Sequence, residues 1–469
     1  MDPRRPRWPH PVWLALFVLA AAAAALSAGR EPLDRALVGL VRPADFARDF
    51  VAAEDWIAGN PVYGEWPGRL ERHAALLGID SRIRGPFFAH HPSALLLVAP
   101  LVPLGFRAAA FVWAGLSIGL LVILAGVLAD ALPIRRPTLA AGLLLVALVS
   151  WPPVLYNLEK GQWSIALATL IALTWRDLGH GRERRAGVCL GIASLVKLTP
   201  LLFLLYLVVV RRRRTAVACL ATVAFAATIP TVLLGPAIWT AFAERARWAA
   251  TFWETWLSNT LSLDALPART LDGGPGMAPL GHWPWAARVV TGLAAAGLGW
   301  TALSLTRETG GRRAPSLDGA LFALWAVLVV VLNPLAWSHY AIMLVLPALL
   351  ILAMAADPGV SLTTGARRVV FAMVGAALTL LSVPKETLFR HIAPVPVTPV
   401  RSAGFLALHF DGALLLFAAA AYLARPRRSG SLAVGRRGKE PALAGGGAST
   451  SCDRIGRERA RADSERPAA

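Results

Sequence analysis

Apolar runs long enough to cross a bilayer alternate with short clusters of arginine along most of this chain. A hydrocarbon core of about 30 Å needs roughly 20 mostly apolar residues per helix, and stretches such as 108–128 and 216–234 meet that requirement. Only 16% of the 469 residues are charged and 56% are hydrophobic, whereas soluble domains carry about 25% charged residues and disorder requires low hydrophobicity. Three scattered cysteines exclude a disulfide framework. The chain is therefore predicted to be an all-α polytopic membrane protein.

The arginine clusters indicate which helix ends face the cytoplasm. Short basic loops between spans mark the cytoplasmic side, and much of the excess behind the net charge of +19 lies in such loops. The sequence contains no basic soluble domain that would suit nucleic acid, so no nucleic-acid partner is expected. The clusters assigned to the cytoplasm are 135–136, 182–185, 211–214, 312–313, 367–368 and 425–428.

Placing every cluster in the cytoplasm requires two apolar segments not to cross. Residues 92–104, which two prolines interrupt, are expected to be interfacial or re-entrant. The run 186–210 enters and leaves on the cytoplasmic side, which predicts two half-helices meeting near residues 197–200. Residues 12–29 form either the first span, which we favour, or a cleaved signal peptide. We expect about 10–13 transmembrane helices, the further spans being 108–128, 139–156, 165–175, 216–234, 286–305, 317–332, 340–355, 369–383 and 403–423.

The chain is expected to form one transmembrane domain, residues 1–424, of a multi-pass cell-membrane protein. Its first extracytoplasmic loop, about 30–91, is long and polar, and apolar residues recur at helical spacing over 45–58. This spacing predicts a short amphipathic helix at the membrane interface. The tail 425–469 is rich in Gly, Ala, Ser and Arg, which predicts a disordered cytoplasmic segment that either contacts anionic lipid or is simply solvated.

Asp45 is the first ionisable residue expected close to the hydrocarbon, where charges are costly and commonly functional. A carboxylate at this position could be a general base, a cation ligand or a helix N-cap. Asp49 is a rival for the same role, because it lies one helical turn further along on the same face. The residues alone leave these alternatives open.

Two further ionisable residues, Lys197 and His339, also lie next to apolar segments. Lys197 needs an anion such as a phosphate, or else its side chain snorkels to the surface. His339 could donate to a phosphate, shuttle a proton or be structural. Lys160 has a weaker claim because Glu159 beside it could neutralise it. No metal site is expected, because His90 and His91 lack partners at zinc-ligand spacing.

The motifs together resemble the polyprenol-phosphate-mannose-dependent mannosyltransferases of glycosyltransferase family 87, in the membrane-embedded GT-C superfamily. The resemblance runs from Asp45 to about Leu346, and the segment 187–202 is its most specific part. Its carriers are Asp45-Phe46, Ala52-Ala53, Gly59, Pro61-Val62-Tyr63, Pro92, Pro100-Leu101, Pro153-Val154, Gly161-Gln162, the run Ala186 to Ala193, Lys197 to Leu202, Asn333-Pro334 and Trp337 to Tyr340.

Two elements depart from the family pattern. A Tyr-Pro-Pro-like element is replaced by Phe88-Ala89-His90-His91-Pro92, and an Asn-Gln-Ser-like element appears only as Ser258 to Ser262, with Asn259. The resemblance implies a GT-C type bundle in which the first outer loop carries the essential aspartate, and the matching position is Asp45. It also implies a substrate-binding set of Lys197, His339, Gln162, Asn259 and Tyr63.

The implied reaction moves a hexose, expected to be mannose, from a polyprenyl-phosphate sugar to a lipid or glycan acceptor on the extracytoplasmic face. Asp45 would deprotonate the acceptor, cations would stabilise the leaving phosphate, and a single base would invert the anomeric centre. No cofactor is implied. A transporter or flippase of lipid-linked sugars is the alternative, since it would share the spans and the phosphate-binding cations. A structural membrane partner without activity, or the transfer of another sugar, are further alternatives.

Overall fold

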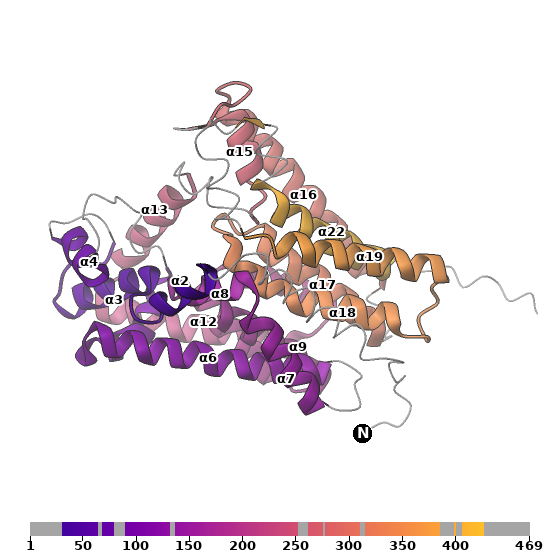
Figure 1. Ribbon diagram of the computed structural model, residues 1–469, viewed down its shortest axis with the longest axis horizontal. Coiled ribbons are helices and arrows are strands. Elements are labelled where there is room, and N and C mark those ends of the chain that lie inside the picture. The colour runs from indigo at the N-terminus through magenta and orange to yellow at the C-terminus, as the bar shows by residue number, and fades with distance from the viewer. Residues whose placement is uncertain are drawn as a thin grey trace, which may run out of the picture. The chain divides into compact units, whose positions relative to one another are not determined.

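The computed structural model describes residues 31–63, 68–78, 90–131, 137–251, 261–274, 277–309, 315–384, 398–399 and 406–425. The elements within these residues are helices (Figure 1). The predicted all-α class is therefore confirmed. The first predicted span 12–29, the tail beyond Arg425 and Asn259 lie outside the described residues.

Among the described residues, five helices are long and apolar enough to cross a membrane, and all five fall on predicted spans. Bulky apolar side chains are exposed along them, such as Phe225 on α12 and Trp300 on α16, as expected for helices that face lipid. The five are α6 (Phe106–Ala131), α12 (Arg213–Leu234), α16 (Pro284–Thr309), the continuous pair η3 (Ser338–Leu344) and α18 (Val345–Ala356), and α19 (Thr364–Leu381).

One predicted span, 139–156, is not a single helix. The chain turns by 66° between α7 (Pro137–Val149) and α8 (Pro152–Lys160). Pro152 and Pro153 lack the N–H groups that would continue α7, and they begin a new helix instead. At the bend, the buried Trp151 indole Nε1 donates to Ser382 Oγ over 2.7 Å.

Three other predicted spans coincide with helices of 16 or 17 residues, fewer than the roughly 20 residues that cross a bilayer. Among the described residues, the helices that could cross number five, or six if the bent pair is one span, rather than 10–13. The predicted number also includes span 12–29, which lies outside the described residues. The short helices are α9 (Ser164–Gly179), α17 (Pro315–Val331) and α22 (Leu408–Ala424).

The predicted pair of half-helices is present over residues 183–209. α10 (Glu183–Val196) ends at Lys197, whose backbone is extended, and η2 (Thr199–Leu202) and α11 (Phe203–Val209) follow. Pro200 in the first turn of η2 prevents α10 from continuing through this point.

α10 packs against α12 with the two helices running in the same direction. A Cβ at Gly187 would lie 2.4 Å from the Thr215 carbonyl oxygen, and one at Gly191 would lie 2.6 Å from Thr222 Cβ. Only glycine permits this approach. The beginnings of α10 and α12 therefore lie at the same end, which agrees with a segment 186–210 that enters and leaves on one side.

The described residues between 31 and 104 contain five short helices. α3 confirms the predicted helix, but residues on both of its faces are buried. Phe46 and Phe50 pack against Phe106 and Trp113 of α6, and Asp55 pairs with Arg69 of α4. The helices are α2 (Glu31–Gly39), α3 (Ala44–Ile57), α4 (Arg69–Leu77), α5 (Pro92–Val98) and η1 (Ala99–Leu104).

The long segment between α12 and α16 carries α13 (Ala237–Thr251) and α15 (Ala265–Leu271). Before α15 the chain pairs with the loop that follows α17, since Leu261 N–H donates to the Ala336 carbonyl over 3.1 Å and Leu263 N–H to that of Val331 over 2.9 Å. These bonds attach the segment next to η3, which carries His339.

Candidate functional site

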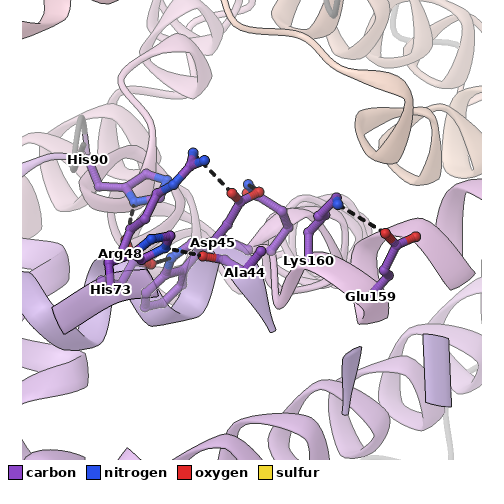
Figure 2. Close-up of polar contacts among 10 residues, drawn as sticks. Ala44, Asp45, Arg48, His73, His90, Glu159 and Lys160 are labelled. Atoms are coloured by element: carbon purple, nitrogen blue, oxygen red, sulfur yellow. Dashed lines mark hydrogen bonds and ion pairs between the residues drawn. The ribbon is translucent and has the colours of Figure 1, made fainter. Parts of the chain in front are cut away.

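Asp45 lies in the first turn of α3 with 6% of its surface exposed. Gln162 Nε2 donates to its Oδ2 over 2.5 Å, and Arg48 Nη1 lies 3.1 Å from its Oδ1 (Figure 2). The N-cap of α3 is Pro43, and α3 has no side-chain cap. The cap alternative for Asp45 is therefore wrong, and both carboxylate oxygens face polar partners at the start of the helix.

The surroundings of Asp45 keep its carboxyl group ionised. Burial opposes ionisation, but Arg48, Lys160, the hydrogen bond from Gln162 and His339 together lower its pKa below the ordinary value of 3.8. A lowered pKa stabilises the folded state at neutral pH, and this contribution is lost as the pH falls through the folded-state pKa. The side chain is therefore a carboxylate at neutral pH.

Gln162 reaches Asp45 because its loop lies tightly against α3. Gly161 has φ +68°, and a Cβ there would approach Phe46 Cβ to 2.8 Å. Two bonds fix this loop: Trp113 Nε1 donates to the Gly161 carbonyl over 2.9 Å, and Asn157 Nδ2 donates to the Gln162 carbonyl over 3.0 Å. A glycine that accepts a left-handed backbone and close packing thus positions the predicted substrate-binding Gln162.

Asp49, the rival of Asp45, is held differently. Trp163 Nε1 donates to Asp49 Oδ2 over 2.8 Å, and His90 Nδ1 lies 2.9 Å from Oδ1. Only 1% of Asp49 is exposed. Its two oxygens thus join α3 to the starts of α9 and α5, which is a structural role.

Lys160 lies closer to the site than its acidic neighbour suggested. Its Nζ pairs with Glu159 Oε1 at 2.9 Å, as expected, and Arg35 Nε lies 3.8 Å from the other oxygen of Glu159. The positive charge of Lys160 nevertheless acts on Asp45. Because Arg35 and Lys160 both pair with Glu159, these three side chains keep a net positive charge beside the Asp45 carboxylate.

His339 is also brought to Asp45, across almost three hundred residues of chain. It is 1% exposed in η3, and its charge when protonated would favour the ionised form of Asp45. Its ring lies among Tyr156, Trp337 and Tyr340, with ring centroids 4.8–6.0 Å away.

Two other predicted site residues lie apart from the carboxylate. The Tyr63 hydroxyl donates to the His90 carbonyl over 2.6 Å, so it is linked to Asp49 rather than to Asp45. Burial raises the pKa of Tyr63, and the charge of Asp49 raises it further. Lys197 is half-buried at the break after α10, and among the described residues no hydrogen bond or ion pair joins it to Asp45.

His91, which belongs to the segment 88–92 that departs from the family pattern, stabilises the start of α5. His91 Nδ1 accepts from the Ser93 N–H over 3.3 Å and so caps α5, while its ring packs against Trp239 and Phe242. Burial lowers the pKa of His91 to about 4, which keeps the imidazole neutral and able to accept. Within the described parts of the chain, no three His, Cys, Asp or Glu side chains gather as a metal site would require.

Sequence reasoning missed Arg48 as a partner of the catalytic candidate. Its position three residues after Asp45 on a predicted helix is the signal that could have identified it, because such pairs face each other. The roles of His90 and Trp163 carried no comparable signal, since their partner Asp49 is distant in sequence.

Comparison with known proteins gives one family model and two similar proteins. Residues 88–279 match the model of glycosyltransferase family 87, a segment that includes Lys160, Gln162 and Lys197. The polyprenol-phosphate-mannose-dependent alpha-(1-2)-phosphatidylinositol mannoside mannosyltransferase of Mycobacterium tuberculosis is 27% identical over 64% of this chain and 68% of its own. Its counterpart from Mycolicibacterium smegmatis is 26% identical over 64% and 67%. No solved structure matches.

Proposed function

We propose that the chain is a membrane glycosyltransferase of family 87 that transfers mannose from a polyprenyl-phosphate carrier to a lipid or glycan acceptor. The transfer inverts the anomeric centre and takes place at the extracytoplasmic face. The two relatives are named for polyprenol-phosphate-mannose as donor and for a phosphatidylinositol mannoside as acceptor. The observation that carries the proposal is Asp45, an ionised and nearly buried carboxylate surrounded by cationic side chains.

Asp45 is the proposed base. An acceptor hydroxyl gives its proton to an Asp45 oxygen as the hydroxyl oxygen bonds to the anomeric carbon. The bond from that carbon to the carrier phosphate breaks, and its electron pair leaves with the phosphate. One carboxylate acting opposite the leaving group gives inversion, by the logic of an inverting glycosidase. A low pKa keeps the base ready at neutral pH, although it makes the carboxylate a weaker base.

Arg48, Lys160 and His339 are the proposed groups for the donor phosphate, because all three act on Asp45. A leaving phosphate gains negative charge as its bond breaks, and preorganised cations stabilise that charge. Gln162 orients the base through its hydrogen bond. Lys197, Tyr63 and Asn259 remain proposed substrate-binding residues on the basis of the family resemblance, outside the immediate surroundings of Asp45.

Incubation of membranes with radiolabelled polyprenyl-phosphate mannose tests the function. Label should move from the donor to a lipid or glycan fraction in membranes containing this chain and not in membranes without it. Movement of intact labelled donor across the membrane, with no new labelled product, would instead support the transporter alternative.

Lys160→Met is expected to raise the KM for the donor by about tenfold, and more than Lys197→Met does. Lys160 acts on Asp45, whereas among the described residues no hydrogen bond or ion pair joins Lys197 to it. One charge-assisted bond to phosphate contributes roughly 1.5–3 kcal/mol. The measurement is transfer rate against donor concentration for both variants. A larger effect of Lys197→Met would indicate that the donor phosphate binds near the break after α10, and it would contradict the assignment of Lys160 to the phosphate.

The proposed orientation predicts that position 58 is labelled from outside the cell and position 214 only after permeabilisation. Both residues are exposed, and they belong to the first loop and to an arginine cluster. The assay uses Ala58→Cys and Arg214→Cys in a chain whose own three cysteines are replaced, with an impermeant thiol reagent. Labelling of position 214 in intact cells would reverse the orientation.

A further inference from the structure

Two exposed arginine clusters lie side by side where α10 and α12 begin. The ion pair between Glu183 Oε1 and Arg212 Nη1, at 3.1 Å, joins the two turns, and the parallel packing at Gly187 and Gly191 fixes the helices next to each other. We call this surface the arginine patch; it consists of Arg182, Arg184, Arg185, Arg211, Arg212, Arg213 and Arg214.

Few carboxylates balance the arginine patch. Asp177 is buried; its Oδ1 lies 3.7 Å from Arg182 Nη1 and its Oδ2 lies 3.5 Å from Arg185 Nε. Glu183 pairs with Arg212, and Asp318 lies close enough to act on Tyr206 together with Arg212. Three carboxylates against seven arginines leave an excess of four positive charges. Arg184, Arg213 and Arg214 are exposed and take part in none of these pairs.

The two turns of the patch have the same backbone geometry. Arg182 and Arg212 are N-caps with φ near −84° and ψ of 59°. Their N–H groups donate over 2.8 Å to the carbonyls five residues earlier, on Asp177 and Leu207. The chain thus builds one turn twice, once before α10 and once before α12.

The residue at the left-handed position differs between the two turns. In the first turn it is Gly181, with φ +72°, and in the second it is Arg211, with φ +59°. Within the described residues Arg211 is the one non-glycine residue with positive φ. An L-residue pays a conformational cost there that glycine avoids. The second turn therefore carries a strained backbone and one extra guanidinium on the charged surface.

We propose that the arginine patch binds the head groups of anionic phospholipids, and that Arg211 contributes to this contact at the cost of a strained backbone. Guanidinium groups form paired hydrogen bonds with phosphate. The patch lies at the ends of helices among which α12 is long and apolar enough to span the bilayer, so head-group phosphates are at its level. The unbalanced positive charge complements a negative surface. This surface is separate from the Asp45 site, and the proposal does not rest on mannosyl transfer.

Arg211→Gly separates binding from folding, because it removes a charge and relieves the backbone at once. The full chain in detergent is titrated with dioctanoyl phosphatidylglycerol and dioctanoyl phosphatidylcholine, and thermal unfolding is followed. We expect Arg211→Gly to unfold at a higher temperature without lipid, yet to bind phosphatidylglycerol about fivefold more weakly, since each basic residue near an anionic surface contributes about that factor. Gly181→Arg should change both quantities in the opposite direction.

Matched variants test whether the effect belongs to this surface. Arg184→Gln with Arg214→Gln should weaken phosphatidylglycerol binding by about tenfold or more, and high salt should reduce the preference. Arg107→Gln with Arg288→Gln removes the same charge from exposed positions elsewhere and should have little effect. Equal losses in the two pairs, equal binding of both lipids, or competition by inorganic phosphate at concentrations similar to the lipid would each overturn the proposal.

Discussion

Replacing Asp45 by asparagine is expected to lower mannosyl transfer by about 10²- to 10⁴-fold, the usual cost of a lost general base. The asparagine oxygen can still accept from Gln162, which donates to Asp45 Oδ2 over 2.5 Å. The amide cannot take a proton from the acceptor, however, and it gives Arg48 no negative partner. The variant should therefore insert and fold while losing transfer. Label transfer is measured together with expression and thermal unfolding in detergent.

Asp49→Asn is the matched control, since it makes the same change one helical turn away. Its oxygen can still accept from Trp163, and its amide can donate to His90 when that nitrogen is unprotonated. We expect reduced stability and substantial remaining transfer. If Asp45→Asn keeps near-normal transfer, or if Asp49→Asn loses as much at equal folded protein, Asp45 is not the base.

The sequence predicted the helical framework because apolar runs and prolines are local signals. The spans at 108–128 and 216–234 follow from hydropathy alone, and α6 and α12 contain them. The break at Lys197 followed from the placement of basic clusters on one side, and the extended backbone of Lys197 confirms it. The bend at Pro152 was not predicted, because two prolines within a long apolar run also suit a kinked span.

The surroundings of Asp45 could not be predicted, because they depend on packing between distant segments. Gln162 lies 117 residues from Asp45 along the chain, and only the close packing of Gly161 on α3 brings them together. Lys160 looked neutralised by Glu159, since no local signal indicated that Arg35 also approaches that carboxylate. Local charge balance is therefore a poor guide to the field at a buried site.

Asp55→Ala is expected to destabilise the fold by roughly 3–5 kcal/mol, the cost of leaving a buried charge without its partner. Asp55 is fully buried, Arg69 is 3% exposed, and Arg69 Nε lies 2.6 Å from Asp55 Oδ2. Arg72 also donates to Asp55. Arg69 also donates hydrogen bonds to the carbonyls of Pro61 and Val62. The Asp55–Arg69 pair therefore attaches α4 and the segment leading to Tyr63 to α3.

The double variant Asp55→Leu with Arg69→Met separates loss of the pair from an uncompensated charge. Replacing a buried ion pair by apolar residues of similar size is often neutral, so the double variant should recover most of the unfolding temperature that Asp55→Ala loses. Glu71→Ala, which removes an exposed acidic side chain on α4, should change the unfolding temperature little.

The Val62 and Pro61 carbonyls lose their donor in the double variant, and transfer should fall if this segment positions Tyr63 for the substrate. Equal destabilisation by the single and double variants would show that these carbonyl bonds, and not the buried charge, hold α4 in place.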